Sequence, residues 1–420
     1  KLAMGGDKKT PNVIEVIEIA CDECPVSGHV VTESCRGCLA HRCEDVCRRG
    51  AITFDEQQKA HIDKSKCVEC GQCAKVCPYS AIINQKRPCE KACKIKAISM
   101  SSEEHRAAHI DNEKCISCGA CVYQCPFGAI VDKSFILDAV NLIKGSHENQ
   151  DYKVYAVVAP SVSSQFSYAK LGQVITGIQR LGFYHVIEAA LGADMVAYKE
   201  AAELAEKGFL TSSCCPAFVS YIKKNFPTMV DKISHNLSPA AEIGRYIKET
   251  TPGAKVVFIG PCAAKKLEAS RRTIRSDVDF VLTFEEVMGM FEAKAIKFSE
   301  VAAGPELVEA TADGRGFAVS GGVANAVVNA IHKMDPDREV KVMAAQGLQE
   351  CKKMLMLAKA GKLNGYLLEG MACPGGCVAG AGTLQNPVKS TAALNKYKAS
   401  APEKYSVDSK YEITLNLLHD

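Results

Sequence analysis

The part of the sequence that decides the fold is a turn rich in cysteine and glycine, Glu369-Gly-Met-Ala-Cys-Pro-Gly-Gly-Cys377. It follows an apolar run, Tyr366-Leu-Leu368, which predicts a buried strand. Its two cysteines are four residues apart, so both thiols can reach one metal centre. The glycines let the backbone approach that centre without a Cβ clash. Two other turns carry matching cysteines, Thr211-Ser-Ser-Cys-Cys-Pro216 and Gly260-Pro-Cys-Ala-Ala-Lys-Lys266.

These three turns resemble the signature loops of the [FeFe]-hydrogenases, and the resemblance covers most of residues 150–390. It implies an H-cluster, in which a [4Fe-4S] cubane is bridged to a two-iron subsite that carries CO, cyanide and an azadithiolate. The cubane ligands implied are Cys215, Cys262, Cys373 and Cys377, with Cys377 as the bridge. The activity implied is the reversible conversion of H2 into protons and electrons.

The resemblance also implies roles for residues around the cofactor. Cys214 would pass a proton to the bridging amine, Lys265 would donate to a cyanide, and Met371 would pack near the bridging ligand. The expected proton relay runs to solvent through Cys214, Glu200, Ser238 and Glu203, in that order. Each assignment has a plainer alternative: a second buried thiol, a solvent-facing lysine, a core methionine and an ordinary pair of glutamates on a helix surface.

The turns also depart from the usual pattern of the family. Ser213 is an extra residue, Phe218 replaces a tryptophan, Gly260 replaces a methionine and Ala264 replaces a serine. The segment Gly380-Ala-Gly-Thr-Leu-Gln385 interrupts a run that is usually Gly-Gly-Gly-Gln-Pro. These features resemble the variant subclass called group B.

Sixteen of the 22 cysteines lie within residues 21–125, at repeated spacings of two and three residues. Such spacings are typical of iron–sulfur ligation, whereas disulfide scaffolds are usually short secreted chains. Each repeat ends in Ala-Ile, and the repeats form two double units, 35–83 and 89–131. Each double unit resembles a bacterial two-cluster ferredoxin.

In that ferredoxin pattern, three cysteines wrap one cubane and the fourth reaches the neighbouring one. The three quartets that we expect are Cys35, Cys38, Cys43 with Cys77; Cys67, Cys70, Cys73 with Cys47; and Cys115, Cys118, Cys121 with Cys93. The remaining four, Cys21, Cys24, Cys89 and Cys125, would close a fourth cubane. The alternatives for Cys21 and Cys24 are a separate mononuclear metal site or a pair of idle thiols. His41, in a widened gap of the first run, is expected to be a loop residue rather than a ligand.

The composition limits the possible partners. The net charge of +3 does not favour nucleic-acid binding, and no apolar run is long enough to span a membrane. The sequence shows no signal-peptide pattern, and its many thiols suit a reducing, anaerobic cytoplasm. Basic residues surround the half-unit at Cys89, namely Lys86, Arg87, Lys91, Lys94 and Lys96. They predict either a docking surface for a ferredoxin-type electron carrier or an ordinary solvated surface. Hydrogenase maturation proteins are further partners that the resemblance implies.

The expected fold class is ferredoxin-like α+β iron–sulfur domains followed by an α/β catalytic domain, with two lobes of twisted, mostly parallel sheet flanked by helices. The domains expected are residues 11–84 and 85–133, a linker helix and loop at 134–151, and the catalytic domain at 152–420. Strands are predicted at 154–159, 255–259, 278–282, 340–345 and 365–368, alternating with helices. Cys351 falls on one such helix and is expected to be a buried structural thiol.

Three functions other than a hydrogenase are consistent with parts of the sequence. A sensor of H2 or redox state would have the same centre, but no signalling region is visible. An iron–sulfur assembly homologue would lack the equivalents of Cys214 and Lys265, both of which are present. A polyferredoxin would leave the α/β part of the chain unexplained.

Overall fold

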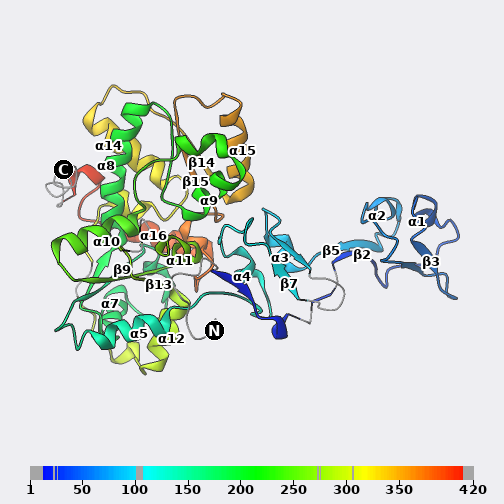
Figure 1. Cartoon of the computed structure of the whole chain (residues 1–420), viewed down its shortest axis with the longest axis horizontal. Helices are drawn as coiled ribbons and strands as arrows, with labels where there is room; N and C mark the ends of the chain where they lie inside the picture. The colour runs from blue at the N-terminus through cyan, green and yellow to red at the C-terminus, as the bar shows by residue number, and fades with distance from the viewer. Residues whose placement is uncertain are drawn as a thin grey trace. The chain divides into compact units, whose positions relative to one another are not determined.

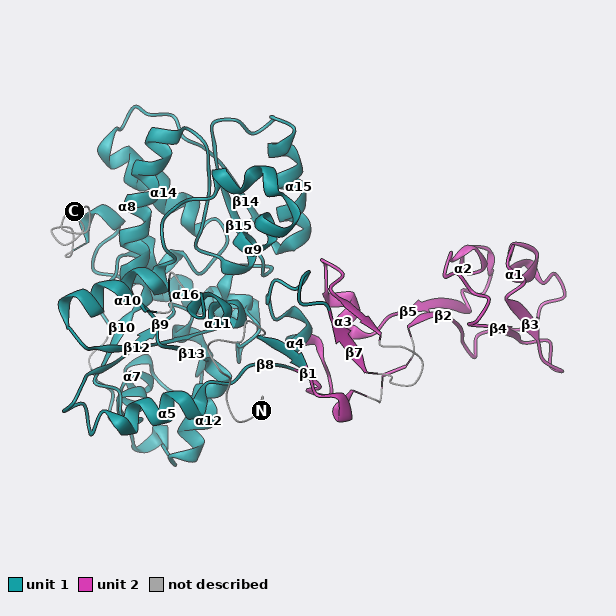
Figure 2. Cartoon of the chain, viewed as in Figure 1, with its two compact units in different colours: residues 1–15, 111–123, 131–420 teal, residues 16–110, 124–130 magenta. Residues whose placement is uncertain are grey.

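The computed structural model describes residues 13–21, 24–25, 27–100, 107–271, 274, 276–304 and 307–409. Its contacts divide the chain into two compact units. Unit 1 contains residues up to 15, 111–123 and everything from 131 onward, and unit 2 contains residues 16–110 and 124–130 (Figure 2). This grouping differs from the expected boundaries, because the segment 111–123 packs with the α/β part of the chain.

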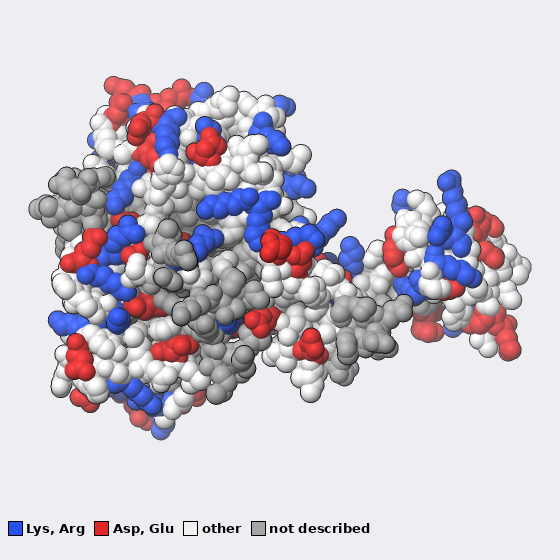
Figure 3. All heavy atoms as spheres, in the orientation of Figure 1, with Lys and Arg blue, Asp and Glu red and all other residues white. Residues whose placement is uncertain are grey.

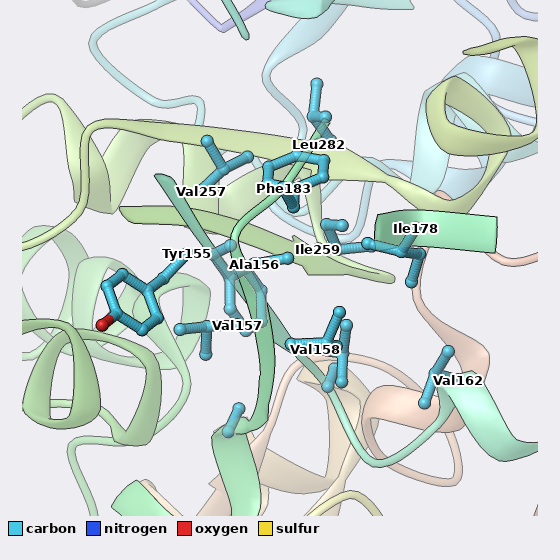
Figure 4. Close-up of a cluster of buried hydrophobic side chains, with 14 of the residues drawn as sticks. Tyr155, Ala156, Val157, Val158, Val162, Ile178, Phe183, Val257, Ile259 and Leu282 are labelled. Carbon is cyan, nitrogen blue, oxygen red and sulfur yellow. The ribbon is translucent and has the colours of Figure 1, made fainter. Parts of the chain in front are cut away.

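The larger sheet of unit 1 has four parallel strands in the order β10 (His185–Glu188), β9 (Val154–Val158), β12 (Lys255–Gly260) and β13 (Phe280–Thr283). Every residue of β9 is buried, as expected for a central parallel strand covered on both faces. Helix α10 (Pro239–Thr250) lies on one side of the sheet, with α5 (Ile136–Gly145), α7 (Leu171–Arg180) and α12 (Phe284–Ala293) on the other (Figure 1). Figure 4 shows the apolar side chains that fill this core.

The smaller sheet has three parallel strands in the order β11 (Leu210–Thr211), β15 (Tyr366–Met371) and β14 (Lys341–Gln346). The helices α8 (Ala189–Lys207), α14 (Gly322–Met334) and α15 (Gly347–Lys359) pack around it. The expected fold class is therefore confirmed. Strand β10 was not expected, because a stretch of only four residues gives too little pattern to identify a strand.

The remaining helices of unit 1 connect or cover these two sheets. They are α6 (Val162–Gln165), α9 (Pro216–Asn225), α11 (Ala263–Ala269), α13 (Ala312–Gly316) and α16 (Pro387–Ala399). Strands β11, β12 and β15 each run into one of the three cysteine turns. The functional turns thus lie at the carboxyl ends of parallel strands, where α/β proteins place their sites.

One buried lysine ties the segment after the third cysteine run to this α/β core. Lys266 on α11 is 1% exposed, and its Nζ lies 2.7 Å from Asp132 Oδ2 and 2.9 Å from Glu286 Oε2. It also donates to the carbonyl of Lys133 at 2.7 Å. A buried ammonium with this many partners fixes the segments that supply them.

Unit 2 is built from short hairpins and single-turn helices. Its antiparallel pairs are β2 (Gly28–Val31) with β5 (Ile82–Gln85), β3 (Ile52–Phe54) with β4 (Ala60–Ile62), and β6 (Ile98–Met100) with β7 (Ala108–Ile110). Its helices are α1 (Arg42–Asp45), α2 (Gln72–Val76) and α3 (Pro88–Ala92). The small apolar core around the β3–β4 hairpin packs directly on cysteines. Elements this small depend on bound metal for much of their stability.

The expected basic surface around α3 is partly wrong. Lys86, Lys91, Lys94 and Lys96 are exposed, but Arg87 is only 1% exposed. Its guanidinium donates to the carbonyls of Pro25 at 3.3 Å and Cys24 at 3.4 Å. The charge of Arg87 alone suggested exposure, whereas its burial depends on a segment some sixty residues earlier in the chain.

Acidic and basic side chains are interspersed over the face shown in Figure 3, in keeping with the nearly balanced charge. None of the helices described is both long enough and apolar enough to cross a lipid bilayer.

Candidate metal centre

Five cysteines from the three turns line one cavity inside unit 1. Cys214 and Cys215 precede α9, Cys262 precedes α11, and Cys373 and Cys377 follow β15. Together with small apolar residues, mainly alanine, proline and glycine, they line a cavity of about 90 Å³. The turns that the sequence placed far apart therefore meet at a single site.

The chemistry of the four expected cubane ligands suits a metal cluster. Burial raises the pKa of each of these thiols, that of Cys262 to about 12, and repulsion from neighbouring cysteines adds to the effect at Cys262, Cys373 and Cys377. Four thiolates cannot coexist at such a site without positive charge close by, and thiolate-bound iron supplies that charge. The residues present therefore fit an iron–sulfur cubane.

One glycine and one aromatic residue pack together next to residues that line the cavity. Gly370 lies on β15 just before Met371, and a Cβ at Gly370 would stand 2.3 Å from ring atoms of Phe218. The Phe218 ring is fully buried and occupies that space. Phe218, which stands where the family usually has a tryptophan, is thus accommodated by the missing side chain of Gly370. Met371 lines the cavity and is 2% exposed.

Lys265 also lines the cavity and has one acidic partner. Its Nζ lies 2.7 Å from Glu268 Oε2, which also accepts a hydrogen bond from the Ser238 hydroxyl at 2.9 Å. Burial lowers the pKa of Lys265, but Glu268 and the nearby cysteines outweigh this effect and raise it. The lysine is therefore a fixed cation in the wall of the site.

The structure changes one member of the expected proton relay. Ser238 bonds to Glu268, whereas the hydroxyl between the two relay glutamates is that of Ser234. Ser234 Oγ donates to Glu203 Oε2 at 2.8 Å, and the same side chain lies close enough to Glu200 to lower the pKa of that carboxyl. The expectation for Ser238 is thus wrong, because the two serines share one loop and only its folded path decides which faces the glutamates.

The two glutamates have different environments. Glu200 is fully buried, and burial raises its pKa to about 7, although hydrogen bonds from Ser213 and Ser234 favour the ionised form. Glu203 is also affected by burial, but hydrogen bonds from Lys207, the His235 backbone and Ser234 together lower its pKa. Glu200 thus lies beside Ser234, whose hydroxyl donates to Glu203, so the three side chains lead in order from the interior towards the surface.

The outer end of this chain contains two residues that the sequence did not indicate. Lys207 Nζ lies 2.6 Å from Glu203 Oε1 and 3.3 Å from His235 Nδ1. The backbone N–H of His235 donates to Glu203, and the imidazole is 77% exposed. The four-residue spacing between Glu203 and Lys207 on one helix could have indicated the lysine from the sequence. No such sequence pattern indicates His235. At the inner end, the charge of Glu200 acts on the thiol of Cys214.

A carboxylate holds the last cysteine turn against a helix. Glu369 on β15 is fully buried and accepts N–H bonds from Gly321 at 2.7 Å and Ala324 at 2.8 Å. These donors belong to the first turn of α14, where the helix dipole favours negative charge. Glu369 therefore fixes the strand that delivers Cys373 and Cys377.

The third cysteine run reaches the same cavity. Cys118 lines it and contributes to the raised pKa of Cys373. A Cβ on the neighbouring Gly119 would stand 2.5 Å from Ala381, and Lys224 donates to the carbonyl of Cys115 at 2.8 Å. These contacts all lie within unit 1. The expected fourth ligand, Cys93, belongs to unit 2, so that pairing stays a prediction.

The first ferredoxin-like part groups its cysteines as the spacing requires. Cys43 lies close to Cys38 and Cys77, and Cys73 lies close to Cys67 and Cys47. Among the described residues, no three Cys, His, Asp or Glu side chains are arranged to hold a single metal ion. A cubane differs in this respect, because each of its ligands binds a different iron atom.

Two residues with plainer expected roles are also located. His41 stacks on the ring of Phe54 at 3.7 Å between centroids. Cys351 is fully buried and donates to the carbonyls of Ala345 and Met371, as a structural thiol would. None of the 22 cysteines, all of which lie in the described ranges, forms a disulfide.

Comparisons with known proteins agree with this centre. The model of the iron only hydrogenase large subunit, C-terminal domain, matches residues 152–381. Models of a 4Fe-4S dicluster domain and a 4Fe-4S binding domain match residues 34–81 and 108–131.

Three individual proteins illustrate the range of relatives. The periplasmic [Fe] hydrogenase large subunit of Nitratidesulfovibrio vulgaris is 28% identical, and the match covers 78% of this chain and 87% of that protein. The cytosolic Fe-S cluster assembly factor NAR1 of Eremothecium gossypii is 25% identical over 52% of this chain and 63% of its own length. A solved [FeFe]-hydrogenase, HydA(deltaEFG), shares the fold with a TM-score of 0.56 and 22% identity, covering 67% of this chain and 93% of that one.

Proposed function

Because this chain belongs to the iron only hydrogenase large subunit family, we propose that it catalyses the reversible oxidation of H2 to protons and electrons. The observation that carries the proposal is the enclosed cavity where five cysteines and Lys265 meet, with a buried acid chain leading away from it. Cys215, Cys262, Cys373 and Cys377 would hold the cubane, and Cys377 would bridge to the two-iron subsite. When bound, this H-cluster would supply the two-electron chemistry that interconverts H2 and protons.

The chain's own residues handle the proton. The Cys214 thiol faces the cavity but is not needed as a cubane ligand, so it can hold a proton beside the cofactor. Glu200 exchanges that proton with Cys214, and Ser234 hands it on to Glu203. Lys207 and the exposed His235 lie at the solvent end. Lys265 and Met371 position and enclose the cofactor.

Electrons use a separate route. Cys115, Cys118 and Cys121 would hold a cluster next to the same cavity, since Cys118 lines it. The clusters of unit 2 would continue this route to a ferredoxin-type carrier, which the exposed lysines around α3 would attract. Protons and electrons thus leave the site through different parts of the protein.

A second candidate is a non-catalytic iron–sulfur protein, because the assembly factor NAR1 is among the relatives. The test is to mature the protein anaerobically with the two-iron cofactor, then record infrared spectra and H2 evolution from a low-potential reductant. We expect CO and cyanide bands together with turnover. Bands without turnover would favour a sensor, and the absence of bands would favour an assembly-type protein.

The role of Cys214 is tested in the same assay. Cys214→Ala removes the thiol without touching a cubane ligand, so the infrared bands should remain while turnover falls by roughly 10²- to 10⁴-fold. Unchanged turnover would refute the proton-carrying role.

A further inference from the structure

The second double unit of cysteines repeats the structure of the first, except that it lacks the CxxC pair with which the first begins. In the first, Cys43 lies in α1, Cys47 follows four residues later, and the β3–β4 hairpin comes next. In the second, Cys89 lies in α3, Cys93 follows four residues later, and the β6–β7 hairpin comes next. The two hairpins pair in the same register, Ile52 with Ile62 and Ile98 with Ile110. Only the first double unit has a CxxC pair, Cys35 and Cys38, directly before its helix and hairpin.

The missing pair comes from the start of unit 2. In the first double unit, the backbone N–H of Ala60 on β4 donates to Cys35 Sγ at 3.5 Å. In the second, the N–H of Ala108 on β7 donates to Cys21 Sγ at 3.3 Å. Ala60 and Ala108 occupy the same place in the two hairpins. Cys21 therefore takes the position of Cys35, although it stands 68 residues before Cys89 in the sequence.

The backbone contact of the fourth cysteine is also the same in the two double units. The N–H of Ala81 donates to Cys77 Sγ at 3.4 Å, and the N–H of Ala129 donates to Cys125 Sγ at 3.3 Å. All four thiols of the second set, Cys21, Cys24, Cys89 and Cys125, line one small cavity. The rest of its lining is mainly apolar and includes Pro88, Pro126, Phe127, Ala129 and Ile130. A small, mainly apolar cavity lined by four thiols suits a thiolate-bound cluster.

One wall of this cavity is a buried cation. Arg87 lines it, with Nη1 at 4.0 Å from Cys21 Sγ. Its other contacts in this region are the carbonyls of Pro25 and Cys24, and none of the described carboxylates forms an ion pair with it. Burying a guanidinium is unfavourable unless negative charge lies nearby. Four thiolates around a [4Fe-4S] core carry net negative charge, which would offset it.

We propose that Cys21, Cys24, Cys89 and Cys125 bind a [4Fe-4S] cluster, and that Arg87 is its fixed counter-charge. The cluster accepts one electron, passing from the 2+ to the 1+ core state. A buried cation stabilises the reduced, more negative state, so Arg87 raises the reduction potential. This cluster then takes up an electron more readily than it would without Arg87. The assignment does not depend on the proposed H2 chemistry.

The first test counts iron and sulfide in the anaerobically reconstituted full chain. The double variant Cys21→Ala/Cys24→Ala should lose about four iron atoms and four sulfides per chain. Cys351→Ala, which removes a buried thiol outside the cluster sites, is the matched control and should lose none. An unchanged iron content would overturn the site, and a loss of about one iron would indicate a single ion instead of a cubane.

The second test measures potential, and its readout is independent of H2 turnover. The electron paramagnetic resonance component that disappears in the double variant identifies this cluster during titration with dithionite. In Arg87→Gln, we expect full iron content and a more negative midpoint potential for that component. Arg180→Gln, at an exposed arginine on α7, is the control and should leave it unchanged. An unshifted potential, or loss of iron in Arg87→Gln, would overturn the tuning role.

Discussion

Replacing Glu200 by glutamine tests the proton chain at its most constrained point. Glu200→Gln keeps the size of the side chain and an acceptor for the N–H of Ser213, but it cannot release a proton. In the folded protein the pKa of Glu200 is about 7, against an ordinary value of 4.5. At pH 7 about half of the Glu200 carboxyls are then protonated, compared with about one in 300 at the ordinary pKa. Burial therefore prepares this group to both accept and give protons near neutral pH.

We expect Glu200→Gln to lower H2 evolution by roughly 10²- to 10⁴-fold, the usual contribution of a positioned proton-transfer group. The assay is H2 evolution from a reduced low-potential mediator between pH 6 and 8.5, with infrared spectra to verify that the cofactor is loaded. Glu206→Gln, on the exposed side of the same helix, is the matched control and should keep full activity. A Glu200→Gln enzyme within about twofold of wild type across this pH range would refute the relay.

The same substitution has a pH-dependent effect on stability. A raised folded-state pKa favours the folded state while the carboxyl is protonated, and that contribution is lost as pH rises through 7. With pKa values of 4.5 unfolded and about 7 folded, wild type should lose about 1.4 kcal/mol relative to Glu200→Gln between pH 6 and 8.5. Denaturant unfolding of both proteins at the two pH values measures this difference.

Four further substitutions test the relay, the packing beside the cavity and the Lys266 anchor. Ser234→Ala should lower turnover by roughly 10-fold or more because it removes the hydroxyl between the glutamates, whereas Ser238→Ala should leave the pH profile of turnover unchanged. Gly370→Ala places a Cβ in the space of the Phe218 ring, so the yield of cubane-loaded protein should fall, as measured by iron content. Lys266→Met removes the buried cation from two partly buried carboxylates and should destabilise the protein by about 3 kcal/mol, as measured by denaturant unfolding; an unchanged midpoint would contradict the anchoring role.

Much of the site could be predicted because its ligands are cysteines at informative spacings. The turns at Cys215 and Cys373 follow strands of one parallel sheet, and the turn at Cys262 follows a strand of the other; in each sheet the parallel strands bring such turns to the carboxyl end. The relay glutamates could be predicted for a similar reason, since Glu200 and Glu203 share one helix face.

The remaining features depend on contacts that no local pattern contains. Ser234 and Ser238 lie four residues apart in one loop, and only the folded path of that loop decides which one meets the glutamates. The charge of Arg87 suggested a surface position, but a segment near Cys24 encloses it. His235 contacts Glu203 through its backbone N–H and lies at the surface, and neither property can be predicted from the residue type alone.

The contacts of the third cysteine run bear on how this protein can be shortened for engineering. A cut at residue 134, where the linker helix was expected to begin, would remove Cys118 from the cavity wall and Gly119 from its contact with Ala381. It would also remove Asp132 and Lys133, the partners of Lys266. A minimal fragment that keeps the cavity wall intact must therefore begin near residue 111, because this short segment of a ferredoxin-like repeat also lines the cavity of the metal centre.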